Sequence, residues 1–152
     1  MTDSRSVFFA GRLARLQEEL GRIGAGGLLV FSSESDNRPG IQYFSGFTGS
    51  FAVLVLGRNG GRLVTDSRYF LQAEEESFFP LVRMEDRDPW PAVGQALREL
   101  DVKSLAVEDD RLTLERGRAL GKIASSVVGT SGLVRRIRAV KDEEELGKMR
   151  RS

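Results

Sequence analysis

A hairpin signal in the middle of the chain constrains the fold more than any other feature. Residues 51–56 are apolar at every position, which is typical of a strand covered on both faces. The turn that follows contains Asn59-Gly60, a dipeptide that favours a tight connection between antiparallel strands. Residues 62–65 supply the returning strand. The chain is therefore expected to contain an antiparallel strand pair that other elements cover.

Helical and strand patterns alternate on both sides of this hairpin. Apolar residues recur at helical spacing from Phe9 to Ile23, and the glycines that follow end this helix and open a strand at residues 28–31. Asp88 is expected to cap a later helix, with Pro89 at its first position. Other helices are expected at residues 67–76 and after Thr113, and other strands at residues 81–84, 104–107 and 126–128. This order predicts an α/β domain with a mixed sheet, the hairpin embedded in it, and helices on both faces.

Histidine and cysteine are both absent from the 152 residues. Their absence excludes Ser-His and Cys-His nucleophile systems, and it removes the commonest transition-metal ligand and general base. No apolar run approaches the roughly 20 residues of a membrane span, so no membrane partner is expected. The net charge of +1 gives no overall attraction for nucleic acid, and none is expected as a partner. A cytoplasmic location is the default expectation for a chain without cysteine.

Carboxylates follow two of the predicted strands. Glu108 and Asp109 come after residues 104–107, and Asp66 comes after the returning strand of the hairpin. Ligands bind at the carboxyl ends of strands in open α/β sheets, and Mg²⁺ prefers oxygen ligands. A nuclease-like magnesium site is one interpretation. The alternative is a polar turn that prepares the next helix, and it is favoured because no spacing rule here is specific to a metal.

Aromatic residues gather among small, flexible ones at residues 43–51. Part of this cluster must pack into the core, whereas aromatic rings beside small residues also suit a binding lip at the surface. The candidates for that lip are Tyr43, Phe44, Phe47 and Ser50.

A cation beside an aromatic residue follows the hairpin. Arg68, next to Tyr69, suits a carboxylate ligand or an acidic residue of a partner. The alternative is an ion pair within the domain, with Glu74 or Glu75. The sequence leaves both interpretations open.

Four segments, in this order, resemble the amino-terminal domain of the creatinase, prolidase and aminopeptidase P family. They are YFSGFTGSF at residues 43–51, TDSRY at 65–69, QAE at 72–74, and the pair SGLV at 131–134 with RAVKDEEE at 138–145. The likeness is greatest to Xaa-Pro aminopeptidases and prolidases of bacterial type. Ser67 departs from the family pattern, which usually has glycine there.

The resemblance implies a ribonuclease H-like fold for residues 1–141. Residues 142–152 would start the first helix of a carboxy-terminal catalytic domain. In the family that domain binds two divalent metals, Mn²⁺, Co²⁺ or Zn²⁺, and cleaves the peptide bond before proline. No catalytic residue, metal ligand or cofactor is therefore expected in this chain.

The resemblance also implies a supporting role. The domain would help to form a homodimer and, beside its own catalytic domain, would limit the entry of proline-containing peptides. The lip and Arg68 are the candidates that match family motifs, and the polar loop with Asp36 and Arg38 is a candidate without one. Non-peptidase binding proteins of the same fold, including a histone-chaperone subunit, are the alternative.

Overall fold

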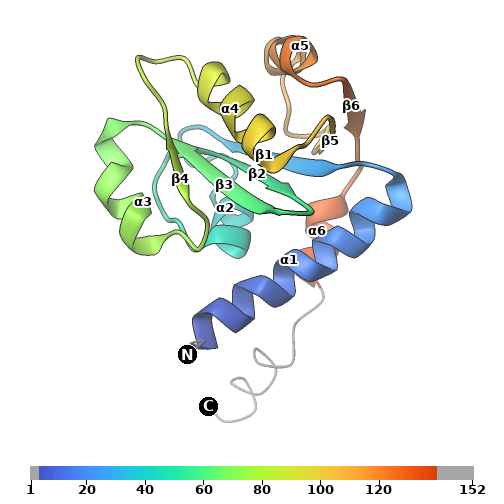
Figure 1. Cartoon of the computed structure of the whole chain (residues 1–152), viewed down its shortest axis with the longest axis horizontal. Coiled ribbons are helices and arrows are strands. Elements are labelled where there is room, and N and C mark those ends of the chain that lie inside the picture. Colours follow the sequence, from blue (N-terminus) through green and yellow to red (C-terminus); the bar gives the residue numbers. More distant parts are fainter. Residues whose placement is uncertain (1–3, 140–152) are drawn as a thin grey trace.

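The computed structural model describes residues 4–139 (Figure 1). Its six-stranded sheet has the order β4-β3-β2-β1-β5-β6. The strands are β1 (Gly27–Ser32), β2 (Ala52–Gly57), β3 (Gly60–Thr65), β4 (Leu81–Arg83), β5 (Ser104–Val107) and β6 (Ser126–Gly129). The helices are α1 (Ser4–Ile23), α2 (Arg38–Ser45), the 3₁₀ helix η1 (Ser67–Tyr69), α3 (Phe70–Glu76), α4 (Trp90–Leu100), α5 (Leu114–Ile123) and α6 (Leu133–Ala139). The helix expected at residues 142–152 lies outside the described residues.

The central hairpin is confirmed. β2 pairs antiparallel with β3, with Val53 opposite Val64 and Gly57 opposite Gly60. Gly60 has a φ of 119°, a conformation that residues with side chains rarely adopt, so glycine is required at this turn. β2 also pairs antiparallel with β1, and every residue of β2 is buried.

Each face of the sheet carries its own core. Leu54 and Leu56 of β2 pack on the core that contains buried residues of α1, α2 and α6. Val53 and Val55 pack on the opposite core with residues of α4 and α5. Figure 1 shows α4 and α5 on one side of the sheet and α1 and α6 on the other. The prediction of a mixed α/β sheet with helices on both faces is confirmed.

The strand directions bring several connections to one edge of the sheet. β1 is parallel to β5, and β3 is parallel to β1 because both are antiparallel to β2. The carboxyl ends of β1, β3 and β5 therefore lie along one edge, together with the amino end of β2. We call this the carboxyl edge. It is formed by the connections that follow these strands and by the segment that leads into β2.

One helix begins differently from the prediction. α4 starts at Trp90, and Pro89 occupies the cap position rather than the first helical position. Asp88 still caps this end, because its Oδ1 accepts a hydrogen bond from the Trp90 N–H at 3.1 Å. The helix predicted at residues 67–76 is divided into η1 and α3. No helix within residues 4–139 has the length and apolar character needed to cross a membrane.

Burial of β2 on both faces gives a direct test of the core. Leu54→Ala should lower the free energy of unfolding by about 2–5 kcal/mol, because the Leu54 side chain is fully buried in a central strand. Leu71→Ala is the matched control, since Leu71 is 70% exposed and its loss should cost at most about 0.5 kcal/mol. Urea unfolding of the two variants makes the measurement. Equal losses would contradict the assigned core.

Candidate functional site

The carboxyl edge joins segments that are distant in the sequence. The Ser35 N–H donates to the Ser50 carbonyl at 2.9 Å, which ties the loop after β1 to the segment before β2. Arg111, after β5, donates from Nη1 to the Asp36 carbonyl at 2.6 Å. The loop that contains Asp36 is therefore held between the predicted lip and the β5 connection.

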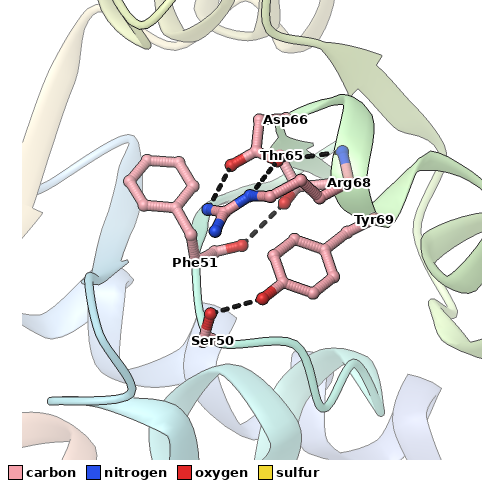
Figure 2. Close-up of polar contacts among 6 residues, drawn as sticks. All are labelled: Ser50, Phe51, Thr65, Asp66, Arg68 and Tyr69. Carbon is pink, nitrogen blue, oxygen red and sulfur yellow. Dashed lines mark hydrogen bonds and ion pairs between the residues drawn. The ribbon is translucent and has the colours of Figure 1, made fainter.

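Arg68 and Asp66 form a two-pronged ion pair at this edge (Figure 2). Arg68 donates from Nε to Oδ1 of Asp66 at 2.9 Å and from Nη2 to Oδ2 at 2.8 Å. An ion pair within the domain was one of the two interpretations, but its partner is Asp66 rather than Glu74 or Glu75; Oε1 of Glu74 instead lies 3.3 Å from Nη2 of Arg83. The tight turn of η1 explains the choice, because the Asp66 carboxylate accepts the Arg68 backbone N–H at 3.0 Å and thereby reaches the guanidinium.

The ion pair orients Arg68 without burying it. The Arg68 side chain remains 66% exposed, and its guanidinium lies 5.0 Å from the centroid of the Tyr69 ring. Hydrogen bonding from Arg68 lowers the pKa of Asp66, and Asp66 in turn raises the pKa of Arg68. The two sequence interpretations are therefore compatible. Arg68 has an intradomain partner, and it also presents a fixed cation to the surroundings.

Tyr69 connects Arg68 to the predicted lip. Its hydroxyl lies 2.5 Å from Oγ of Ser50, as Figure 2 shows. On the same side, Thr65 Oγ1 donates to the Phe51 carbonyl at 2.6 Å. These two hydrogen bonds connect the segment before β2 to the end of β3 and to η1. Ser50, Arg68 and Tyr69 form one continuous site, which we call the Arg68 site.

Two of the predicted lip residues belong to the core. Phe44 is 1% exposed and Phe47 is fully buried, so neither presents its ring to a partner, and the core interpretation applies to both. The Phe47 ring meets Tyr69 edge to face, with centroids 5.9 Å apart. Gly49 permits this arrangement, because a Cβ at that position would lie 2.3 Å from the Phe47 ring. The buried Phe47 ring therefore packs against Tyr69 of the Arg68 site.

A polar network that was not predicted from the sequence contacts the lip segment through Thr48. Glu76 accepts from the backbone N–H of Thr48 at 2.9 Å and from its hydroxyl at 2.8 Å. Gln72 donates to Thr48 Oγ1 at 3.0 Å. Partial burial opposes ionisation of Glu76, but these hydrogen bonds outweigh it and lower the pKa of the carboxyl. The available signal was the QAE segment, which includes Gln72 but stops short of Glu76.

The remaining candidates lie in different places. Asp36 is exposed, and its Oδ1 accepts the Ser33 N–H at 2.8 Å. Arg38 is also exposed and donates to Ser35 Oγ at 3.0 Å. The hydrogen bond between Ser35 and Ser50 connects their segment to the Arg68 site.

Tyr43 is separated from the other lip residues. It is half-buried on α2, and its hydroxyl lies 3.4 Å from the Ile137 carbonyl on α6. Its ring centroid lies 4.0 Å from the Arg12 guanidinium on α1. Tyr43 thus faces α1 and α6 rather than Arg68.

The carboxylates proposed for magnesium do not converge. In the sheet order, β2 and β1 lie between β3 and β5, so Asp66 and Glu108 follow strands about 14 Å apart. Mg²⁺ binds its ligands at about 2.0–2.1 Å. Within residues 4–139, no group of three or more His, Cys, Asp or Glu side chains could hold a metal ion. The polar-turn interpretation fits better, because the backbone N–H groups of Arg111 and Leu112 donate to the Glu108 carbonyl.

Glu108 instead forms a pair with a buried amide. Asn37 is 3% exposed and donates from Nδ2 to Glu108 Oε1 at 2.8 Å. Burial raises the pKa of Glu108, although the hydrogen bond from Asn37 opposes this effect. The pair joins the carboxyl ends of the parallel strands β1 and β5 and therefore has a structural explanation.

The ion pair between Asp66 and Arg68 should make stability depend on pH. Because the folded-state pKa of Asp66 is lowered, its contribution is present above the unfolded-state value of about 3.9 and is lost as the pH falls through the folded-state value. Arg68→Gln should therefore lower the free energy of unfolding slightly at pH 6, with a smaller loss near pH 2. Urea unfolding at both pH values checks this. Arg83→Gln removes a guanidinium that lies 3.3 Å from a half-exposed Glu74 and 5.0 Å from the Phe70 ring centroid, and it should show less pH dependence. An equal response of the two variants would contradict the assignment.

Comparisons with known proteins found a family model and solved structures that are similar to this chain. The model of the Creatinase/Prolidase N-terminal domain matches residues 12–140. The X-Pro aminopeptidase of Thermotoga maritima is 32% identical, with a TM-score of 0.75 over 90% of this chain and 38% of that one. The Xaa-Pro dipeptidase of Bacillus anthracis is 25% identical, with a TM-score of 0.78 over 91% and 38%.

Further matches agree with this fold. The N-terminal domain of the cytoplasmic peptidase PepQ of Mycobacterium tuberculosis is 22% identical, with a TM-score of 0.71 over 84% of this chain and 98% of that one. Among curated proteins, the uncharacterized peptidase YqhT of Bacillus subtilis is 23% identical over 89% of this chain and 37% of its own length. The chain thus spans less than two fifths of the full-length peptidases that it matches. Since the family model covers most of its length, the chain belongs to the creatinase/prolidase N-terminal domain family.

Proposed function

We propose that this chain is the non-catalytic amino-terminal domain of a proline-specific metallopeptidase of the cytoplasm. The observation that carries the proposal is the family match over residues 12–140, with an X-Pro aminopeptidase and an Xaa-Pro dipeptidase among the similar structures. The sequence contains no histidine, and residues 4–139 hold no cluster of metal-ligating side chains. Two divalent metals, Mn²⁺, Co²⁺ or Zn²⁺, would belong to a separate catalytic domain.

The role of the domain would be to help form a homodimer and to limit which peptides enter the active site. The Arg68 site supports this proposal. Its guanidinium is oriented by Asp66, largely exposed, and flanked by Tyr69 and Ser50. A fixed guanidinium binds carboxylates well because its planar donors match their geometry. The carboxylate would belong to a proline-containing peptide or to an acidic residue of the second subunit.

The loop with Asp36, and Arg38 at the start of α2, extend this surface. Both side chains are exposed, and the loop is hydrogen-bonded to Ser50. Glu34 and Ser35 in this loop have φ values of 53° and 66°, which are strained for residues other than glycine. Strain of this kind gathers at binding sites and is retained where neighbouring contacts enforce it. The loop and the Arg68 site would together face the entrance to the active site.

The first test is catalytic. The purified chain, incubated with Mn²⁺ and Xaa-Pro dipeptides and tripeptides, should release no free amino acid. The Thermotoga maritima X-Pro aminopeptidase, assayed under the same conditions, is the positive control. Metal-dependent hydrolysis by the pure chain would contradict the proposal that the chemistry lies elsewhere.

The second test concerns Arg68 in the longer protein that carries this chain. Arg68→Ala should weaken dimerisation or relax the preference for short peptides by about tenfold, because it removes a charge-assisted contact. Sedimentation at several concentrations measures the dimer, and kcat/KM for peptides of increasing length measures the selection. Arg87→Ala is the control, because Arg87 is an exposed arginine in the turn before α4. Unchanged values for Arg68→Ala would remove this residue from the site.

A further inference from the structure

A cavity with a cationic rim lies at the edge of the sheet opposite the carboxyl edge. It has a volume of about 500 Å³ and opens between the ends of α4 and α5 and the residues that lead into β5 and β6. A volume of this size is typical of small-molecule binding sites. Neither the Arg68 site nor any other part of the proposed function uses this cavity.

The floor of the cavity is apolar. Leu97 of α4 and Val102, which follows that helix, are buried in the core beneath α4 and α5. Ile123, at the end of α5, also lines the cavity and is 37% exposed. An apolar group in the cavity would remove part of Ile123 from water, and burial of apolar surface favours binding.

Three cations surround this floor: Arg98, Lys103 and Lys122. The ion pairs within residues 4–139 include none of the three, and Glu99, next to Arg98 in the chain, pairs with Arg62 instead. Arg98 and Lys122 lie in the last turns of their helices, where a cation also stabilises the helix end. Lys103 lies in neither helix, so helix stabilisation does not account for its position.

The lining also contains one acid, Asp101. Asp101 has a φ of 54° at the carboxyl end of α4, and its N–H donates to the Arg98 carbonyl at 3.2 Å. It therefore acts as the helix cap. With three cations and one carboxylate, the lining keeps a net charge of +2. A phosphate monoester carries a charge of about −1.5 to −2 at pH 7 and matches this lining better than a single carboxylate does.

Gly94 leaves space in the wall of the cavity. Glycine in the middle of a helix is unfavourable relative to alanine. Packing within the described part of the chain does not require it here. Outside the backbone of α4, the one atom within 4 Å of a Cβ built at Gly94 is Nη1 of Arg98, at 3.4 Å, which is the far end of a flexible side chain. The missing side chain thus keeps the cavity open and lets the Arg98 guanidinium lie beside it.

We propose that this cavity binds a phosphate monoester with an apolar body. The phosphate oxygens accept hydrogen bonds from the three cations, and the apolar part lies on the floor and covers Ile123. This inference does not depend on the peptidase assignment, because it concerns the opposite edge of the sheet and its test measures binding alone.

The probe is phenyl phosphate, titrated into the chain of 152 residues and followed by NMR. The signal changes should centre on the amides of Gly94, Lys103 and Ser125, which line the cavity. Inorganic phosphate and phenol, which each supply one part of the probe, should bind about tenfold more weakly, because each lacks either the buried ring or the charge. Benzoate, with one negative charge, should also bind more weakly. Equal or tighter binding of any of the three would contradict the proposed ligand class.

Removal of charge tests the cationic rim. The double variant Lys103→Gln, Lys122→Gln should raise the Kd for phenyl phosphate by about tenfold at low salt, since each partly exposed charge contributes up to about fivefold. Arg87→Gln is the control, because it removes an exposed cation before the other end of α4, outside the lining. It should leave the Kd unchanged, and 0.5 M NaCl should reduce the difference between the variants. Equal effects of the two changes would show that the probe follows only the overall charge, and the proposal would be wrong.

Filling the space beside Gly94 tests the cavity itself. Gly94→Leu keeps all three cations but should abolish the signal changes, because its side chain occupies the volume. Gly94→Ala is the control for folding: it should raise the urea midpoint, since alanine favours the helix, and change the Kd little. If Gly94→Leu fails to fold, the lysine variant still decides the question. A folded Gly94→Leu that binds phenyl phosphate as the wild type does would overturn the proposal.

Discussion

The fold depends on one strand that is enclosed on every side. β2 is hydrogen-bonded to β1 on one edge and to β3 on the other, and its side chains alternate between two cores. Leu54 and Leu56 bind the sheet to α1, α2 and α6, whereas Val53 and Val55 bind it to α4 and α5. Such a strand loses almost all contact with water, so its burial contributes strongly to folding. The position of every other element is set relative to it.

The Arg68 site follows from this arrangement. Because β2 and β3 are antiparallel, the residues that enter β2 lie beside those that leave β3. Ser50 and Phe51 thereby meet Thr65 and Tyr69, and two hydrogen bonds close the junction. Arg68 extends from this rigid base with its guanidinium oriented by Asp66. A binding group on a stiff support loses little conformational entropy when a partner arrives.

The two arginines Arg68 and Arg12 differ in their exposure to water. Arg68 is largely exposed, and its guanidinium contacts the Tyr69 ring, which suits the reversible binding of a carboxylate. Arg12 is buried, and its guanidinium lies 3.8 Å from the Phe8 ring centroid and 4.0 Å from that of Tyr43. Tyr43 is separated from the other lip residues in the same way, since its ring contacts Arg12 rather than Arg68.

Local patterns in the sequence were sufficient for the elements and the family. Asn59-Gly60 predicted the hairpin, the spacing from Phe9 to Ile23 predicted α1, and a helix was correctly expected after Thr113, which caps α5. These features depend on neighbours within a few residues, so they can be predicted from the sequence without the tertiary structure. It also found Ser50, Arg68 and Tyr69 as candidates, because they lie in short motifs.

Tertiary structure alone decided which of these side chains reach a surface and what they contact. Phe44 and Phe47 are as aromatic as Tyr69, yet both lie in the core because α2 and the lip fold over the sheet. Because η1 is a tight turn, Arg68 forms its ion pair with Asp66 rather than with Glu74 or Glu75. Asp66 and Glu108 looked equivalent at two strand ends until the sheet order placed two strands between them. The physical reason is the same in each case: burial and charge pairing depend on residues that are distant in sequence, and the packing of the sheet determines which of them meet.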